Sequence, residues 1–245
     1  MTDSTGKEFM RQTRYANMSP SLQEQGLPQP PLELPCEDLL EKFSLPAIDE
    51  INIPAMDVRQ ALGQRKTLRK YSDQSLSLAE LSFLLWATQG VKSVKDNIHT
   101  FRVVPSAGAR HAFETYLLIN RVDGLKPGLY RYLAVEHALA LLPSDPDLPA
   151  KLSEASLKQS KIAFSAVTFI WVAVRERMVW RYNERGYRYL HLDAGHVCQN
   201  LYTAAEPIDC GLCAIAAFDD EQVNALLGLD GEDLFTIYMA SLGKK

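Results

Sequence analysis

The feature that most restricts the fold is a helical stripe of apolar side chains in the last third of the chain. Within residues 178–206, apolar side chains recur every three or four positions. The stripe consists of Tyr187, Leu190, Ala194, Val197, Leu201 and Ala204. This spacing places them along one face of an α-helix. It predicts one long helix whose apolar side packs on a core.

A continuous apolar run comes directly before that helix. Residues 162–174, IAFSAVTFIWVAV, have the length and β-branched content of a buried strand, and are too short for a membrane span of about 20 residues. A hairpin is expected where the turn residues Lys-Pro-Gly precede GLYRY and a second strand, HALALL. Further strands are expected at 115–120, 213–218 and 235–243.

Helical patterns separate these strands. They lie at 36–44, 56–66, 75–91, 147–157 and 219–228. The third has the best-defined start, because Ser77 and Glu80 have the spacing of a capping box, and Gly90 is placed to end it. No tandem βαβ pattern and no G-x-G-x-x-G motif follows a strand, which argues against a dinucleotide fold. We therefore expect an α+β fold with a small, mainly antiparallel sheet between helices.

The N-terminal part differs in composition from the rest. Residues 26–35, GLPQPPLELP, hold four prolines and one glycine, which suit neither a helix nor a central strand. We expect an extended, Pro-rich arm or a poorly ordered leader over residues 1–35, followed by a single domain over 36–245.

Composition excludes several classes of function. A formal charge of −4 and a pI near 5.8 argue against a nucleic-acid binder. No membrane span and no secretory signal are apparent, and four cysteines indicate no disulfide framework, so we expect a cytoplasmic protein. The lone pair Cys210 and Cys213 cannot complete a zinc site, so we expect buried thiols and no metal.

One short basic segment stands out against this acidic background. Residues 63–71, GQRKTLRKY, surround Thr67 with Arg65, Lys66, Arg69 and Lys70. One interpretation is a solvated helix face. The other is an anion site, because guanidinium groups and a hydroxyl are suitable donors to a phosphate.

Four segments together point to one family. RKTLRKY, PSAGARHAFETYLLI, PGLYRY with EHALALL, and RGYRYLHLDAGHVCQNLYTAAE with CGLCAIAAFDDEQVNALLGLDG resemble the nitroreductase-like flavoproteins, most closely the SagB-type dehydrogenases that oxidise azolines in peptides. The resemblance spans residues 59–245. It implies a nitroreductase-like fold and a homodimer, with the long helix at the subunit interface. It also implies FMN at that interface, reduced in many members by NADH or NADPH.

The resemblance also assigns cofactor-binding residues. Arg65, Thr67 and Arg69, with Lys66, would hold the FMN phosphate and ribityl chain, and Lys244 would join them unless it is a frayed tail. The backbone of Ala214, Ile215, Ala216 and Ala217 would face the flavin N5 edge, or else form an ordinary core strand. Pro105, Ser106, Ala107, Ala109 and His111 would lie near the flavin of the partner subunit. Ala109 and Ala112 depart from the family's Asn and Pro, and His111 is alternatively a surface-loop histidine.

The resemblance places the catalytic pair at Arg181 and Tyr182. Azoline-oxidising members have lysine at the first position, and lysine acts as a base when desolvated, whereas arginine stays charged. Arg181 would instead hold a carboxylate or a nucleotide phosphate, while Tyr182 would donate a proton. Both residues would be ordinary surface or interface groups in the alternative interpretation.

Three functions follow. The first is an FMN-dependent oxidoreductase that transfers hydride between NAD(P)H and a small organic acceptor. The second is an azoline dehydrogenase acting on a modified peptide. The third is a flavin-binding dimer without turnover.

Overall fold

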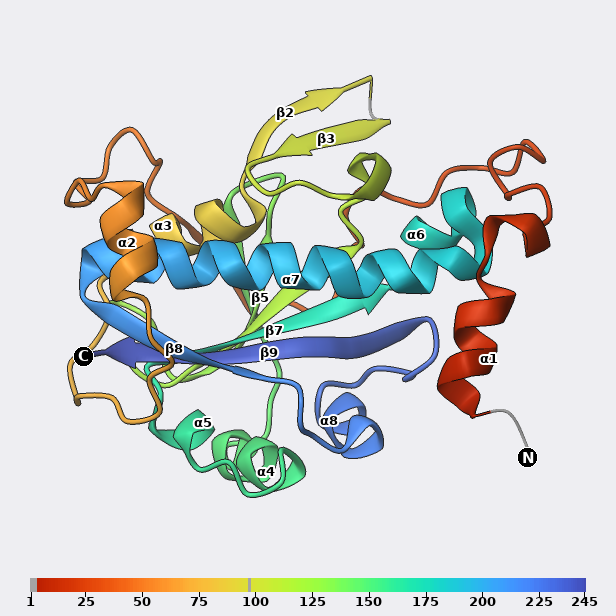
Figure 1. The fold of residues 1–245 in the computed structure, drawn as a ribbon. Helices are drawn as coiled ribbons and strands as arrows, with labels where there is room; N and C mark the ends of the chain where they lie inside the picture. Colours follow the sequence, from red (N-terminus) through yellow and green to blue (C-terminus); the bar gives the residue numbers. More distant parts are fainter. Residues whose placement is uncertain (1–3, 97) are drawn as a thin grey trace.

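A seven-stranded antiparallel sheet with helices on both faces forms the protein (Figure 1). The computed structural model describes residues 4–96 and 98–245. The strand order is β1-β6-β5-β4-β7-β9-β8, and every neighbouring pair is antiparallel. The strands are β1 (Glu41–Ser44), β6 (Ala138–Leu142), β5 (Gly128–Leu133), β4 (Phe113–Ile119), β7 (Val167–Val174), β9 (Leu234–Lys244) and β8 (Cys210–Ile215).

The helices divide between the two faces of the sheet. One face carries α2 (Val58–Gln64), α3 (Leu78–Gln89) and α7 (Gly186–Ala205), and the other carries α4 (Leu148–Ala155), α5 (Lys161–Phe164) and α8 (Asp220–Leu226) (Figure 1). The helix α6 (Arg175–Tyr182) leads into α7, and α1 (Thr5–Gln12) lies near the N-terminus. A separate hairpin consists of β2 (Val91–Lys95) and β3 (His99–Arg102). Short 3-10 turns are η1 (Tyr15–Asn17), η2 (Ala107–Ala109), η3 (Asn183–Arg185) and η4 (Glu206–Ile208).

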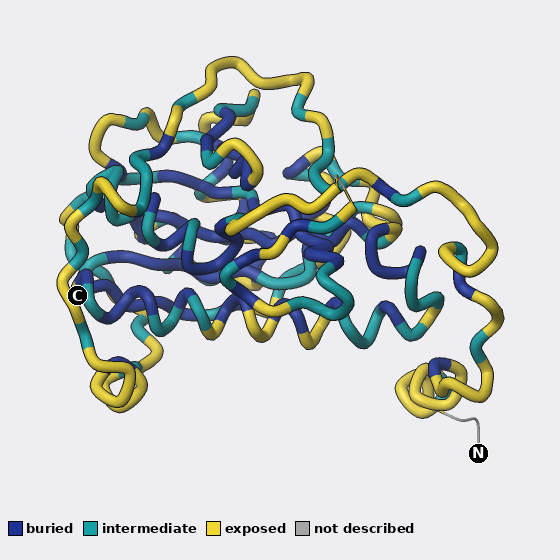
Figure 2. Tube along the Cα trace, turned by 90° about the horizontal axis from the view of Figure 1, so that it is seen from above, coloured by how far each residue is buried: buried dark blue, intermediate teal, exposed yellow. Residues whose placement is uncertain are grey.

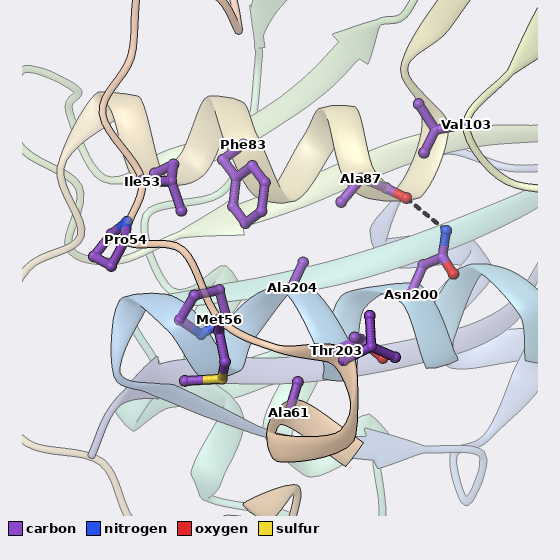
Figure 3. A pocket seen from close by; sticks show the side chains of 12 residues that line it. Ile53, Pro54, Met56, Ala61, Phe83, Ala87, Val103, Asn200, Thr203 and Ala204 are labelled. Carbon is purple, nitrogen blue, oxygen red and sulfur yellow. Dashed lines mark hydrogen bonds between the residues drawn. The ribbon is translucent and has the colours of Figure 1, made fainter.

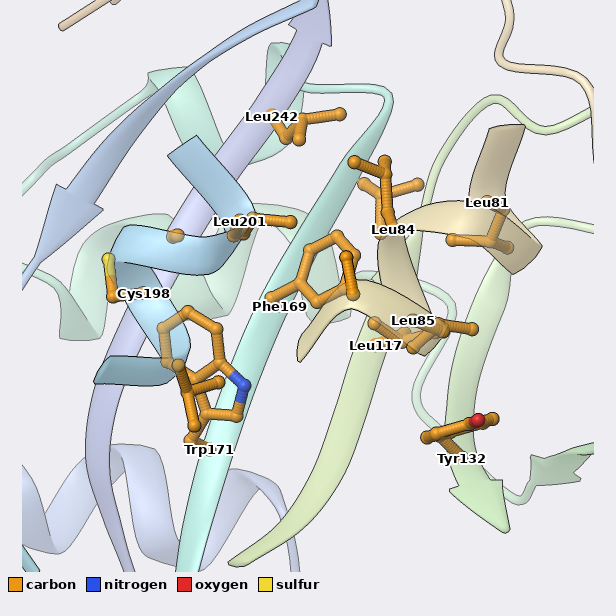
Figure 4. Close-up of a cluster of buried hydrophobic side chains, with 14 of the residues drawn as sticks. Leu81, Leu84, Leu85, Leu117, Tyr132, Phe169, Trp171, Cys198, Leu201 and Leu242 are labelled. Atoms are coloured by element: carbon orange, nitrogen blue, oxygen red, sulfur yellow. The ribbon is translucent and has the colours of Figure 1, made fainter. Parts of the chain in front are cut away.

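The strand β7 joins the two halves of the core. All eight of its residues are buried, because apolar layers cover both of its faces. Phe169 and Trp171 point toward α3 and α7 (Figure 4), whereas Ile170 and Val172 belong to the cluster under α4 and α8. Alternation across a sheet covered on both sides explains why the sequence is continuously apolar here. In Figure 2 the buried trace is concentrated in the sheet and in one side of α7.

The predicted fold class is confirmed, and so are several local signals. The α3 helix has the predicted capping box, with Ser77 Oγ accepting from the Glu80 N–H and the Glu80 carboxylate accepting from the Ser77 N–H. The hairpin of β5 and β6 forms as expected. The apolar run 162–174 is a strand only from Val167, because α5 occupies its first residues.

The helix predicted over 36–44 is wrong. Glu41–Ser44 instead forms the edge strand β1, which pairs with β6 from Glu41 opposite Leu141 to Ser44 opposite Ala138. Its Phe43 ring packs against Tyr130, with 6.0 Å between ring centroids. A vacant sheet edge and one aromatic contact therefore override the local helical pattern.

Two further predictions need correction. The helical region 178–206 is not continuous, because Asn183 adopts φ 48° and ψ −146° between α6 and α7. This positive φ angle bends the chain between α6 and α7, and we call the bend the elbow. The spacing of apolar residues in the sequence does not predict it. The arm over residues 1–35 is not extended throughout, since α1 occupies Thr5–Gln12 after a Ser4 N-cap. Its first three residues lie outside the described residues.

Candidate functional site

The basic segment does not form a helix face. The α2 helix ends at Gln64, and the segment then runs alongside β8, where Thr67 makes a parallel bridge with Leu212. The Leu68 N–H donates to the Leu212 carbonyl at 2.9 Å. Because the cations follow the helix and lie beside a strand, the solvated-helix interpretation is wrong.

Two glycines allow this close approach. Gly211 of β8 and Gly243 of β9 are register partners, so they lie side by side on the sheet. A Cβ atom at Gly211 would lie 2.8 Å from the Leu68 Cβ, and one at Gly243 would lie 2.8 Å from the Tyr71 Cβ. Because neither glycine has a side chain, the basic segment packs directly against the backbone of the sheet at this pair.

Tyr202 of α7 joins the basic segment to the end of β8. Its hydroxyl lies 3.4 Å from Thr67 Oγ1 and accepts from the Ala214 N–H at 3.2 Å. The Arg65 guanidinium carbon lies 5.2 Å from the centre of its ring. We call Arg65, Lys66, Thr67, Arg69, Tyr202 and Ala214 the basic cluster. Tyr202 was not among the predicted site residues, although it lies in the segment RGYRYLHLDAGHVCQNLYTAAE that resembles the family.

The charges of the basic cluster suit a phosphate. Within residues 4–96 and 98–245, no carboxylate pairs with Arg65, Lys66, Arg69 or Lys70, and Lys66, Thr67 and Arg69 are exposed. Unpaired cations beside a hydroxyl provide charge-assisted donors to a phosphate dianion. These residues therefore fit the phosphate group of FMN.

The other predicted cofactor-binding residues near β8 differ in their exposure and in their partners. Ile215 is the last residue of the strand and is buried, whereas Ala216 and Ala217 follow it and are exposed. The Lys244 ammonium donates to the Ile208 carbonyl at 2.8 Å and forms an ion pair with Glu80. Lys244 is thus an anchored residue at the end of β9 and not a frayed tail.

The predicted loop 105–111 forms a second cluster around Asp193. The Asp193 carboxylate accepts from the Ser106 hydroxyl at 2.6 Å and from the Ala107 N–H at 3.2 Å. The His111 N–H in turn donates to Ser106 Oγ at 2.9 Å. Burial raises the pKa of Asp193, while the Ser106 and Ala107 donors act in the opposite direction. Asp193, like Tyr202, was not among the predicted site residues.

The side chains of Arg181 and Tyr182 pack against this loop at Gly108. Gly108 has φ 56°, and a Cβ there would lie 2.4 Å from the Tyr182 hydroxyl and 3.0 Å from Arg181 Nε. The structure therefore brings the predicted catalytic pair together with Ser106, Ala107 and Ala109. We call Pro105–His111 with Arg181, Tyr182 and Asp193 the loop cluster.

His111 is buried and not a surface-loop histidine. Its side chain is 5% exposed, and its backbone has φ 44°. Burial, followed by the nearby Arg102 and Arg110 charges, lowers its pKa to about 3. His111 is therefore neutral near neutral pH, and it acts in the loop as a packed, uncharged ring.

The two clusters lie at different positions along α7. Tyr202 and Asp193 are nine residues apart on the helix, which corresponds to about 13 Å. No hydrogen bond or ion pair among the described residues joins the clusters. An apolar pocket of about 440 Å³ lies between α3 and α7 (Figure 3). At its edge, Asn200 donates to the Ala87 carbonyl at 2.8 Å. None of the described residues that line it is ionisable, so it offers packing surface and not acid–base chemistry.

No metal site is evident in the described ranges. No three His, Cys, Asp or Glu side chains there come close enough to hold a metal ion. Cys210 and Cys213 are buried free thiols of β8. In the same ranges, no helix has the length and apolar character needed to cross a membrane.

A family model describes most of this chain. The Nitroreductase family matches residues 62–244, which include the basic cluster and the loop cluster. The chain belongs to the nitroreductase family. The sequence is 34% identical over 186 residues to a Methanocaldococcus jannaschii protein named as a nitroreductase, covering 76% of this chain and 89% of that protein.

Solved structures agree with this membership. A nitroreductase-family structure from Anabaena variabilis superposes with a TM-score of 0.68 at 26% identity, covering 83% of this chain and 41% of that one. A Desulfovibrio desulfuricans nitroreductase-family structure solved in complex with FMN shares the fold, with a TM-score of 0.54 at 20% identity over 77% of this chain and 86% of that one.

Two further similar proteins are named for the processing of trifolitoxin and the synthesis of microcin. The trifolitoxin-processing protein TfxB of Rhizobium leguminosarum is 29% identical over 154 residues, covering 61% of this chain and 41% of that protein. The Escherichia coli microcin synthetase McbBCD, solved with a truncated precursor bound, contains a chain with the same fold. That chain gives a TM-score of 0.60 at 19% identity, covering 80% of this chain and 75% of its own length.

The close packing of Leu68 on Gly211 leads to a stability prediction. Gly211→Ala should lower the free energy of unfolding by about 1–3 kcal/mol, because the new methyl group overlaps Leu68. Gly63→Ala is the matched control, since nothing lies within 4 Å of that position. Urea unfolding of both variants measures the difference. Equal stability of Gly211→Ala and the wild type would contradict the close packing described above.

His111 leads to a pH prediction. Its folded-state pKa of about 3 lies below the ordinary value of 6.5, so between these values the unfolded chain binds a proton that the folded chain does not. Stability should therefore fall as pH drops through this window, by at most about 1.4 kcal/mol per pH unit. His111→Asn tolerates the positive φ and should flatten this dependence in urea titrations. An unchanged slope would show that His111 does not titrate as inferred.

Proposed function

We propose that this protein is an FMN-dependent oxidoreductase that transfers hydride between NAD(P)H and a small organic acceptor. The observation that carries the proposal is the set of unpaired cations around Thr67, held beside Tyr202 and the end of β8. FMN, when bound, would supply the hydride chemistry at its N5 atom. We expect the enzyme in the cytoplasm.

The residues of the basic cluster would hold and orient the cofactor. Arg65 and Arg69 would donate charge-assisted hydrogen bonds to the phosphate, with Thr67 and Lys66 beside them. The backbone of Ala214–Ala217 would face the ring, where small side chains permit close approach. Lys244 would join the phosphate site only by exchanging its present partners, Glu80 and the Ile208 carbonyl.

We further propose that the enzyme is a homodimer. One flavin would need both clusters, yet they are separated along α7 within one chain. A second copy packed along α7 would place its loop cluster next to the basic cluster of the first. Tyr182 would then act as a proton donor to the acceptor, and Asp193 would position Ser106 and Ala107 beside the ring.

Azoline dehydrogenation of a peptide is the second candidate function. Two similar proteins favour it, because TfxB is a trifolitoxin-processing protein and McbBCD is a microcin synthetase that was solved with truncated pro-MccB17 bound. Tyr182 is present, but Arg181 occupies the position of the expected lysine base. Substrate would then reduce the flavin, and oxygen would reoxidise it.

A visible absorption spectrum followed by anaerobic NADH or NADPH addition tests these proposals. A yellow protein that bleaches with either nucleotide supports the first function. A yellow protein that stays oxidised favours the azoline function or flavin binding without turnover. A colourless protein that does not take up added FMN would overturn every flavin assignment.

The basic cluster leads to a binding prediction. Arg65→Gln and Arg69→Gln should each weaken FMN binding by about 10- to 100-fold, because each removes charged hydrogen bonds to the phosphate. Arg59→Gln is the matched control, since this exposed arginine lies on α2 outside the cluster. Titration of the apoprotein with FMN, followed by flavin fluorescence, measures the dissociation constants. Equal affinities in all three variants would remove the phosphate role from this segment.

A further inference from the structure

The N-terminal arm is fastened across the elbow between α6 and α7. Side chains at the elbow donate hydrogen bonds to backbone carbonyls of the arm before, within and after residues 15–24. Arg185 donates to the Thr13 carbonyl at 2.8 Å, Asn183 to the Ser19 carbonyl at 2.6 Å, and Trp180 to the Leu27 carbonyl at 3.0 Å. These three hydrogen bonds therefore hold the arm in place against the elbow, where the arm acts as a wall.

A pocket of about 540 Å³ lies between this wall and the elbow. Tyr15, Ser19, Pro20 and Glu24 line it from the arm, and Arg181, Tyr182 and Asn183 line it from the elbow. Tyr182 and Arg181 also touch Gly108, so the pocket adjoins the loop cluster. It is thus a hollow at the predicted catalytic pair, and residues outside the family match complete it.

Arg181 is the cation of the elbow whose guanidinium makes no hydrogen bond or ion pair within residues 4–96 and 98–245. Its neighbours Arg177, Arg185 and Arg188 all donate hydrogen bonds to other residues. Within the described ranges, Arg181 has no hydrogen bond or ion pair, and its guanidinium carbon lies 5.7 Å from the Tyr182 ring centre. A half-buried guanidinium with unused donors in a pocket is suited to an oxyanion.

We propose that this pocket binds a carboxylate group of the acceptor, with Arg181 as the specificity-determining residue and the arm as the opposite wall. The inference rests on the proposed oxidoreductase function, for which it names a substrate class. A monoanion fits better than a phosphate dianion, because the pocket offers one free guanidinium. The Glu24 carboxylate, held by the Ser21 N–H and hydroxyl, lines the same pocket and repels additional negative charge.

Two matched probes test the proposal by calorimetric titration of the full-length protein with FMN added. These are 4-nitrobenzoate and 4-nitrobenzyl alcohol, which share the nitro group and the ring. Arg181→Gln should weaken 4-nitrobenzoate binding by about 10- to 100-fold and change alcohol binding less than about twofold. Arg14→Gln, which removes an exposed arginine of the arm, should leave both affinities unchanged.

A second variant tests the arm as a wall. Asn183→Gly removes the hydrogen bond to the Ser19 carbonyl and still permits φ 48°, so it should weaken both probes to a similar degree. Unchanged affinities in Asn183→Gly would overturn the role of the arm.

Other outcomes would overturn the carboxylate site. These are no measurable 4-nitrobenzoate binding by the wild type, an equal loss of both probes in Arg181→Gln, or tighter binding of 4-nitrophenyl phosphate than of 4-nitrobenzoate.

The experiment separates this inference from the proposed function, because heat and not turnover is measured. A chain that bound no FMN but kept Arg181-dependent selectivity for the carboxylate would overturn the oxidoreductase proposal alone. A yellow enzyme that bleached with NAD(P)H but lacked this selectivity would overturn the pocket alone.

Discussion

A single buried carboxylate connects the sheet, the α6 helix and the arm. Glu114 of β4 forms ion pairs with Arg131 of β5 and with Arg177 of α6, and it also accepts from the Leu34 N–H of the arm at 2.9 Å. All three charged side chains are at most 5% exposed. Removing one partner of such a buried pair typically costs about 3–5 kcal/mol, because the remaining charge is uncompensated.

The candidate catalytic pair depends on this connection. Arg177 and Arg181 are one helical turn apart, so fixing Arg177 against Glu114 also fixes where Arg181 and Tyr182 lie over Gly108. The same arginines hold the arm, since Arg177 donates to the Pro31 carbonyl and Arg131 to the Pro35 carbonyl. The wall of the Arg181 pocket and its charged residue are therefore anchored by one network.

The basic cluster is held in place by different means. There, a pair of facing glycines admits Leu68 and Tyr71, and the Tyr202 hydroxyl bridges the basic segment and β8. The two clusters share only α7, which carries Tyr202 near one end and Asp193 nearer the other. A rigid helix packed on the sheet sets the spacing between them, and this spacing underlies the proposal that two chains build each site.

Local patterns in the sequence determined the elements whose signals are self-contained. The sequence alone revealed the apolar stripe of α7, the Ser77–Glu80 capping box, the apolar run of β7 and the basic segment. It also revealed the four segments that resemble the family. The tertiary structure alone decided the strand at Glu41–Ser44, the elbow at Asn183, the burial of His111 and the contacts of Tyr202 and Asp193. Periodicity records which side of an element is apolar. The hydrogen bond from Ser106 to Asp193 joins residues 87 positions apart in the sequence. Only tertiary packing brings two such residues into contact.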